Sequence, residues 1–309
     1  MSDLATVLIF TYRRIPKKLI ESLKANKISK YSILYIFSDG FKNETDKEDV
    51  LKVRKFIKNI DGFKRVNIIE RKRNYGLSSN ILDGITTIIK KYGKVIVLED
   101  DLIVSKDFLE YMNEALDFYK NNKQIWSIAG YSPPLKCLKS YNKDVFLAPR
   151  VNSWGWATWK DRWEIVDWDI KDWEEFKRSK DSIRKFNFGG NDLYKMLELQ
   201  MLGKIDSWAI RWCYNQYKYG AYTLYPKYSK VKNMGFDSLG THNNIKNDKW
   251  FVDISNKKIK LEHVWPDEEL ISCFKNYHDL SFYSRVGYLL RKYGGYNVAK
   301  KIIKMLKLK

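Results

Sequence analysis

The sequence contains only three cysteines among its 309 residues, Cys137, Cys213 and Cys273. Their number is odd and they lie far apart, so they match neither a metal-ligand spacing nor a dense disulfide framework. We expect these cysteines to remain reduced, as is usual in the cytosol.

Long hydrophobic runs are also absent. A membrane-spanning helix needs about 20 apolar residues, and no run approaches that length. The apolar stretch Thr6–Phe10 is too short for a signal peptide and has no basic leader before it. We therefore expect neither a signal peptide nor a transmembrane helix, and a cytoplasmic location.

No glycine-rich loop follows the first apolar run, where residues 11–16 read Thr-Tyr-Arg-Arg-Ile-Pro. Sugar-phosphate nucleotidyltransferases and dinucleotide oxidoreductases need glycines there, because their backbone must approach phosphates closely. The absence disfavours both classes, although the nucleotidyltransferase stays open as an alternative.

Basic residues are abundant, with 57 Lys and Arg against 37 Asp and Glu and a formal net charge of +20. This charge favours anionic partners such as nucleic acid, anionic lipid or phosphorylated substrates. There is no C2H2 zinc-finger spacing, RNP-type motif or basic zipper. We expect no nucleic-acid partner, and a non-enzymatic nucleic-acid-binding protein is the second alternative.

The first 130 residues alternate between short apolar runs and helical spacing. Strands are predicted at residues 6–10, 32–38, 66–70, 95–98 and 125–129. Helices are predicted after Pro16 and across residues 50–60, 81–92 and 108–119. This order is typical of an α/β fold with a mainly parallel sheet flanked by helices.

The later sequence divides into two further parts. Residues 1–130 are the expected nucleotide-sugar-binding half. Residues 131–245 are irregular and rich in tryptophan, and we expect them to form an acceptor-side half packed on the same sheet, since aromatic rings often line sugar sites. Residues 246–309 form a C-terminal extension.

An acidic triplet, Glu99-Asp100-Asp101, directly follows the fourth predicted strand. Ligands of parallel sheets bind beyond the carboxyl ends of the strands. Mg²⁺ and Mn²⁺ prefer oxygen ligands and take one or two carboxylates plus phosphate oxygens. The triplet predicts a Mn²⁺ or Mg²⁺ site for a leaving diphosphate, with Asp101 as metal ligand, Asp100 on the nucleotide side and Glu99 near the sugar. The alternative is a solvated acidic turn at a helix start.

The segment Val97-Leu-Glu-Asp-Asp-Leu-Ile-Val-Ser-Lys-Asp-Phe-Leu-Glu-Tyr111 closely resembles the metal-motif strand and helix of the N-acetylglucosaminyltransferase I family. The resemblance includes Gly76–Gly84, Ser153–Trp156 and Ile205–Trp208, and covers about residues 5 to 245. It implies the GT-A fold and an inverting, metal-dependent transfer from a UDP-sugar. It also implies that Asp39 accepts a hydrogen bond from uracil. The predicted nucleotide-binding set is Thr11, Tyr12, Arg13, Asp39, Asn74, Gly76 and Asp100.

In that family an Asp of a Trp-Asp-Asp-Trp string acts as the base. The matching string here is Ile205-Asp-Ser-Trp208, so the resemblance gives this role to Asp206. Inversion requires one base to deprotonate the acceptor hydroxyl. The alternative is that Asp206 caps the helix beginning near Ser207, and Asp161 and Asp192 are reserve candidates.

Two further site residues are predicted in the second half. Trp156 of the string Trp154-Gly155-Trp156 is expected to contact the donor sugar, against the alternative of a core turn. His242 lies in a stretch of lysines and single glycines, residues 227–244, that is typical of a mobile lid. It is a candidate metal or phosphate contact, against the alternative of a polar loop residue.

The C-terminal segment pairs an apolar helical face, Val298, Ile302 and Met305, with lysines on the other side. Such a basic amphipathic helix either lies on an anionic membrane or docks on the domain. We expect residues 281–309 to contact the inner face of the cytoplasmic membrane. The expected role is transfer of a sugar, with N-acetylhexosamine as one candidate, to a glycan or lipid-linked glycan in bacterial lipopolysaccharide or capsule synthesis.

Overall fold

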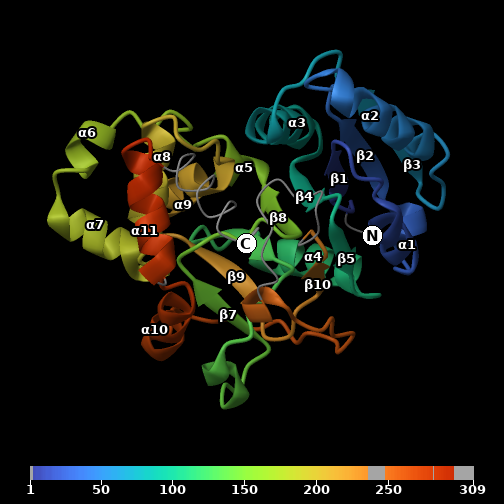
Figure 1. Cartoon of the computed structure of the whole chain (residues 1–309). Coiled ribbons are helices and arrows are strands. Elements are labelled where there is room, and N and C mark those ends of the chain that lie inside the picture. Colours follow the sequence, from blue (N-terminus) through green and yellow to red (C-terminus); the bar gives the residue numbers. More distant parts are fainter. Residues whose placement is uncertain (1–2, 236–247, 281, 296–309) are drawn as a thin grey trace, which may run out of the picture.

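The computed structural model describes residues 3–235, 248–280 and 282–295 (Figure 1). Its strands are β1 (Thr6–Thr11), β2 (Ile33–Ser38), β3 (Arg65–Glu70), β4 (Lys94–Glu99), β5 (Leu102–Val104), β6 (Ile125–Ala129), β7 (Val145–Ala148), β8 (Trp156–Trp159), β9 (Tyr222–Pro226) and β10 (Val231–Asn233). Its α-helices are α1 (Lys17–Lys24), α2 (Glu44–Ile57), α3 (Leu77–Tyr92), α4 (Phe108–Tyr119), α5 (Lys160–Trp163), α6 (Trp173–Phe176), α7 (Lys180–Phe186), α8 (Leu193–Met201), α9 (Trp208–Lys218), α10 (Glu268–Tyr277) and α11 (Phe282–Lys292). Short 3₁₀ helices are η1 (Ser29–Tyr31), η2 (Lys136–Lys139), η3 (Asn187–Gly189) and η4 (Asp248–Trp250).

Eight strands form one mixed sheet in the order β3-β2-β1-β4-β8-β6-β9-β7. Strands β3, β2, β1 and β4 pair in parallel, and β6 and β9 also pair in parallel. Strand β8 runs antiparallel to both β4 and β6, so β6 has the same direction as β4. The carboxyl ends of β1, β2, β4, β6 and β9 therefore meet at one edge of the sheet.

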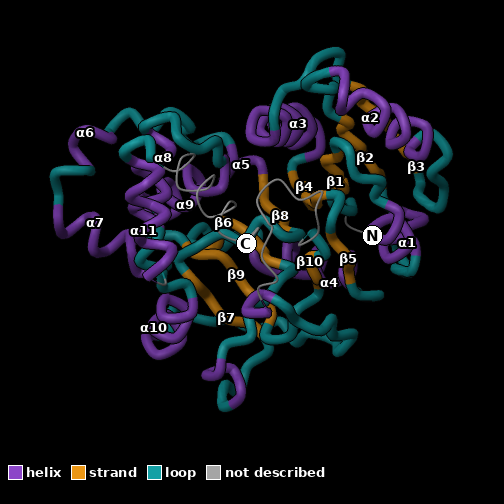
Figure 2. The backbone as a smooth tube through the Cα atoms, viewed as in Figure 1, coloured by secondary structure: helices purple, strands orange, loops and turns teal. Residues whose placement is uncertain are grey.

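Helices cover both faces of this sheet (Figure 2). Successive side chains of a strand point to opposite faces of the sheet. Val7 and Ile9 of β1 therefore lie in the core beneath α1, α2 and α4. Leu8 and Phe10 face the opposite core, under α3, α8 and α9. Both faces of β1 are buried, which explains why its sequence is a continuous apolar run rather than an alternating one.

The predicted fold class is confirmed: the five strands and four helices expected in the first 130 residues are all present. The tryptophan-rich half was expected to pack on this sheet. It also supplies β7, β8 and β9 to the sheet itself, with β8 inserted between β4 and β6.

The C-terminal extension packs on the rest of the chain in its described part. Leu270 and Phe274 of α10 are buried against the far end of the sheet. Helix α11 lies on α8, where Tyr288 donates a hydrogen bond to Glu198 and the Lys292 amine lies 2.9 Å from the same carboxylate. Among the described helices, none has the length and apolar character of a membrane span. The predicted face of Val298, Ile302 and Met305 lies outside the described residues.

The prediction that the cysteines stay reduced is wrong for two of them. Cys137 of η2 and Cys273 of α10 form a disulfide, with Cα atoms 6.5 Å apart, while Cys213 is buried and free. The fold brings together residues 136 positions apart in the sequence. Disulfides persist mainly in oxidising compartments and are reduced in the cytosol, so the state of this pair depends on the compartment in which the protein resides.

We expect reduction of the disulfide to lower the free energy of unfolding by about 2–5 kcal/mol, because a long loop of the unfolded chain is then released. Urea unfolding with and without dithiothreitol measures this. The Cys273→Ser variant provides the control, since its midpoint should already be low and should not respond to reductant. Equal midpoints for the oxidised and reduced wild type would contradict the expectation.

Candidate active site

The acidic triplet lies where β4 ends, beside the end of β1. The Asp100 carboxylate accepts a hydrogen bond from the Tyr12 backbone N–H at 3.2 Å, and the Arg14 guanidinium lies 3.9 Å from it. Burial, together with the neighbouring Asp101 charge, raises the pKa of Asp100 to about 7. The same two causes raise the pKa of Glu99 well above its usual range. Three carboxylates are thus packed where a bound cation would relieve their repulsion.

Asp101 is held by the small sheet of β5 and β10. Strand β10 pairs antiparallel with β5, and the Met234 N–H just beyond it donates to the Asp101 backbone carbonyl at 2.8 Å. A Cβ atom at Gly235 would overlap the Asp101 carboxylate. The carboxylate therefore has room only because residue 235 is glycine.

The residues after β1 are anchored to α2. The Tyr12 hydroxyl and the Arg13 guanidinium each donate to the Asp46 carboxylate at 2.6 Å. Thr11 is buried, and its hydroxyl donates to the Arg14 carbonyl. The predicted nucleotide-side residues of β1 are thus fixed in position at the edge next to the triplet.

Asp39 organises the loop before α3. This buried carboxylate accepts hydrogen bonds from the backbone N–H groups of Tyr75 at 2.8 Å and Gly76 at 3.0 Å, and from the Asn74 side-chain amide at 3.1 Å. Burial raises its pKa, and these backbone N–H groups oppose the rise. The structure therefore brings together three of the predicted nucleotide-binding residues, Asp39, Asn74 and Gly76.

Asp206 lies across from this loop. Its Oδ2 atom is 4.0 Å from the position that a Cβ of Gly76 would occupy, and its side chain is 61% exposed. It does not cap the following helix, because the Ser207 hydroxyl accepts the hydrogen bond from the Ile210 N–H. The Arg211 guanidinium lies 3.9 Å from Asp206. An exposed carboxylate is thus available beside the nucleotide-side loop.

The reserve candidates have structural partners instead. Asp192 forms a two-pronged ion pair with Arg150, at 2.7 and 2.9 Å. Asp161 is paired with Arg162 and Lys123. Both reserve carboxylates are thus held in close ion pairs, whereas the Arg211 guanidinium lies 3.9 Å from Asp206.

The prediction that Trp156 contacts the sugar is corrected. This side chain is fully buried and stacks on Trp208 with ring centroids 4.9 Å apart. Its neighbour Trp154 is only partly buried, and its ring packs edge-on against Tyr131 at 4.7 Å and Trp250 at 6.1 Å. An aromatic surface therefore exists in this half, at Trp154 rather than Trp156.

The predicted metal contact His242 lies outside the described residues. Within the residues that are described, no three or more His, Cys, Asp or Glu side chains are grouped as a metal cage. The triplet still fits Mg²⁺ or Mn²⁺, because such ions are held by one or two carboxylates together with phosphate oxygens and water.

Three charged residues at this edge, Asp46, Arg14 and Arg211, were not predicted from the sequence pattern. Asp46 reads as an ordinary acidic residue in the first turn of a helix, and Arg211 as an ordinary helical cation. Arg211 joins α9 to α3 through a 2.8 Å hydrogen bond to the Ser78 hydroxyl. Only the fold places these charges beside the predicted site.

A mixed α/β sheet with an acidic triplet at the end of its fourth strand is typical of nucleotide-sugar-dependent transferases. The GNT-I family matches residues 6–186, which is more than half of the 309 residues. The chain therefore belongs to the GNT-I family.

Other comparisons are more distant. No curated protein matches the chain significantly. One similar solved structure is described as the crystal structure of GalNAc-T7 with UDP, GalNAc and Mn²⁺. It is 12% identical, and the match covers 75% of this chain and 44% of that chain with a TM-score of 0.43. At this level the likeness supports no argument about activity.

We expect Gly235→Ala to lower the rate of sugar transfer by about tenfold or more, because the new methyl group displaces the Asp101 carboxylate and misplacement of a site group by about 1 Å can cost roughly 100-fold. Initial rates measure the effect, and thermal melting verifies the fold. Gly287→Ala is the matched control, since nothing lies within 4 Å of a Cβ there. Equal rates for Gly235→Ala and wild type would show that this close approach is unimportant.

Proposed function

We propose that this glycosyltransferase moves a sugar from a UDP-sugar to a glycan acceptor with inversion at the anomeric carbon, and that it needs Mn²⁺ or Mg²⁺. The observation that carries the proposal is the placement of the acidic triplet beside the ends of β1 and β2, where the Tyr12 N–H holds Asp100. Ligands of such sheets bind at this edge.

The three carboxylates have separate proposed roles. Asp101 would hold the metal ion, which when bound supplies positive charge to the leaving diphosphate. Asp100 lies against the backbone after β1, which supports a role on the nucleotide side. Glu99 is the last residue of β4 and would accept hydrogen bonds from hydroxyl groups of the donor sugar.

The nucleotide would lie between the end of β1 and the loop before α3. Thr11, Tyr12 and Arg13 would line the first side, and the anchorage of Tyr12 and Arg13 on Asp46 supports a preformed site. Asp39 would contact the uracil, as the family resemblance implies. Its carboxylate already accepts hydrogen bonds from the Tyr75 and Gly76 N–H groups, so any base contact would share these oxygens.

Asp206 is the proposed base. It would take the proton of the acceptor hydroxyl as that oxygen attacks the anomeric carbon opposite the leaving diphosphate. Its exposure and its position next to Gly76 support this role, since the carboxylate can meet an incoming acceptor from solvent.

A nucleotide-release assay with single UDP-sugars and Mn²⁺ tests the proposal. We expect wild-type turnover with at least one donor, and loss of about 100-fold or more in the Asp206→Asn variant, because general base catalysis contributes about 10²–10⁴. Calorimetry should give the variant the wild-type affinity for UDP with Mn²⁺.

Asp181→Asn is the control, since this carboxylate is exposed on α7 and pairs only with its own helix in the described structure. Wild-type turnover in Asp206→Asn would refute the base assignment alone. No metal-dependent UDP binding by the wild-type protein would refute the whole proposal.

We further propose a role in bacterial surface polysaccharide synthesis, with a lipid-linked acceptor, a donor such as UDP-N-acetylhexosamine, and peripheral contact with the inner face of the cytoplasmic membrane. The support is the +20 net charge and the lysine-rich C-terminal sequence. At that location the disulfide would be reduced.

Vesicle sedimentation tests the membrane contact. We expect the full chain to pellet with vesicles rich in anionic lipid at low salt, and removal of residues 296–309, which keeps α11, to abolish pelleting because it removes the terminal lysines. Vesicles of neutral lipid provide the control. An intact protein that stays in the supernatant with anionic vesicles would contradict the proposal.

A further inference from the structure

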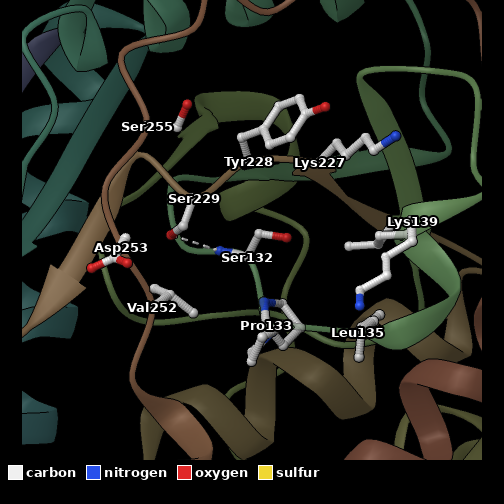
Figure 3. Close-up of a pocket in the computed structure, with 12 residues that line it drawn as sticks. Ser132, Pro133, Leu135, Lys139, Lys227, Tyr228, Ser229, Val252, Asp253 and Ser255 are labelled. Atoms are coloured by element: carbon white, nitrogen blue, oxygen red, sulfur yellow. Dashed lines mark hydrogen bonds between the residues drawn. The ribbon is translucent and has the colours of Figure 1, made fainter.

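A pocket of about 380 Å³ opens near the carboxyl ends of β6 and β9 (Figure 3). Its floor and walls include Pro133, Leu135, Leu138 and Val252, together with Tyr228. Apolar surfaces of this kind pack against the C–H faces of sugars, whose hydroxyl groups then need polar partners at the edge.

Ser132 supplies an unused polar group in this pocket. The residue is 3% exposed, and among the described residues its Oγ atom has no hydrogen-bond partner. Its backbone N–H is satisfied, because it donates to the Ser229 hydroxyl at 3.0 Å. Buried hydroxyls are nearly always hydrogen-bonded, so an orphaned one that lines a pocket indicates a missing partner.

Charged groups stand on opposite sides of the pocket (Figure 3). The Lys139 side chain runs towards Pro133 and Leu135, and within the described residues it forms no hydrogen bond or ion pair. The Lys227 amine is already used, because it donates to the Tyr141 carbonyl. Asp253 lies on the opposite side from Lys139. Among its described lining residues, the pocket thus offers Lys139 as an available cation and, across from it, the Asp253 carboxylate.

The pocket is joined to the proposed active site by the backbone. Its residues Tyr228 and Ser229 lead directly into β10, and the Lys230 N–H donates to the Gly130 carbonyl after β6. Beyond β10 the chain reaches Asp101 through Met234. On the other wall, Val252 follows Trp250, which packs on Trp154. This wall continues from the aromatic surface of the acceptor-side half.

We propose that this pocket binds a negatively charged sugar unit of the acceptor glycan, with its carboxylate or phosphate on Lys139, a hydrogen bond to the Ser132 hydroxyl, and sugar hydroxyls facing Asp253. The inference rests on the proposed function, since it assumes a glycan acceptor. It specifies in addition that the acceptor is negatively charged, and that the protein contacts this acceptor at a second place away from the reacting hydroxyl. A cation accepts either anionic group, and a hydroxyl serves both as donor and as acceptor.

Saturation-transfer NMR on the 309-residue chain loaded with UDP and Mg²⁺, which is diamagnetic, tests this inference. The probes are D-glucuronate, D-glucose 6-phosphate and neutral methyl glucoside. We expect millimolar binding of one or both anionic sugars and at least fivefold weaker binding of the glycoside. Whichever anion binds more tightly identifies the group carried by the acceptor.

Three variants locate the binding. Lys139→Gln should weaken binding of the anionic probe at least fivefold, so that the protein no longer prefers this probe over methyl glucoside. Ser132→Ala should weaken binding of the same probe. It should not lower the melting temperature of the protein, because the hydroxyl that it removes has no partner among the described residues. Lys136→Gln is the matched control, an exposed lysine of the same 3₁₀ helix outside the pocket lining, and should bind as wild type does.

The outcomes separate the inference from the proposed function. Metal-dependent UDP binding without any preference for anionic sugars would overturn the inference and leave the function standing. Equal losses in Lys139→Gln and Lys136→Gln would also overturn it, because the charge effect would then be general. Failure to bind UDP at all would refute the proposed function and the inference with it.

Discussion

The hydrogen bond from the Tyr12 backbone to the Asp100 carboxylate is the contact on which the rest of this site depends. It joins the ends of two neighbouring parallel strands, so the acidic triplet cannot move without moving β1. Tyr12 is in turn held by Asp46 on α2, and the Asp101 carbonyl accepts from the chain beyond β10. Backbone and charge-assisted contacts thus fix carboxylates that repel one another, which is the preorganisation that a charged leaving group requires.

A second network surrounds Lys230, whose side chain is fully buried. Its amine donates to the Asp107 carboxylate and the Lys257 carbonyl at 2.6 Å and to the Ser255 carbonyl at 3.1 Å. A buried ammonium is tolerated because every donor has a partner. These bonds link β10 to the start of α4, which follows the acidic triplet, and to residues 255–257. The wall of the pocket near Ser255 is therefore tied to the same framework as Asp101.

The sequence predicted β1, β2, β3, β4 and β6. Strands that are buried on both faces, such as β1, β4 and β6, are recognisable because they read as unbroken apolar runs. Strand β8 was missed, because Trp156-Ala-Thr-Trp159 is only four residues long and lacks such a run. The error at Trp156 has a similar cause, since sequence cannot tell a ring that packs on Trp208 from one that faces a cleft. The role of Asp206 was predicted from its match to a sequence string of the family rather than from hydrophobic periodicity. The Cys137–Cys273 pair was invisible, because only the completed sheet brings η2 to α10.

The antiparallel strand β8 also affects how the chain folds during synthesis and which segments could be exchanged between related proteins. It pairs with β4 on one side and β6 on the other, yet it is synthesised after both. Until residue 159 has emerged from the ribosome, β4 has one unpaired edge, which is an aggregation hazard. Residues 1–130 and the tryptophan-rich segment after them are therefore interlocked by this strand. A swap of one half between relatives would cut through the middle of the sheet, so specificity in this architecture can change only through loops and side chains.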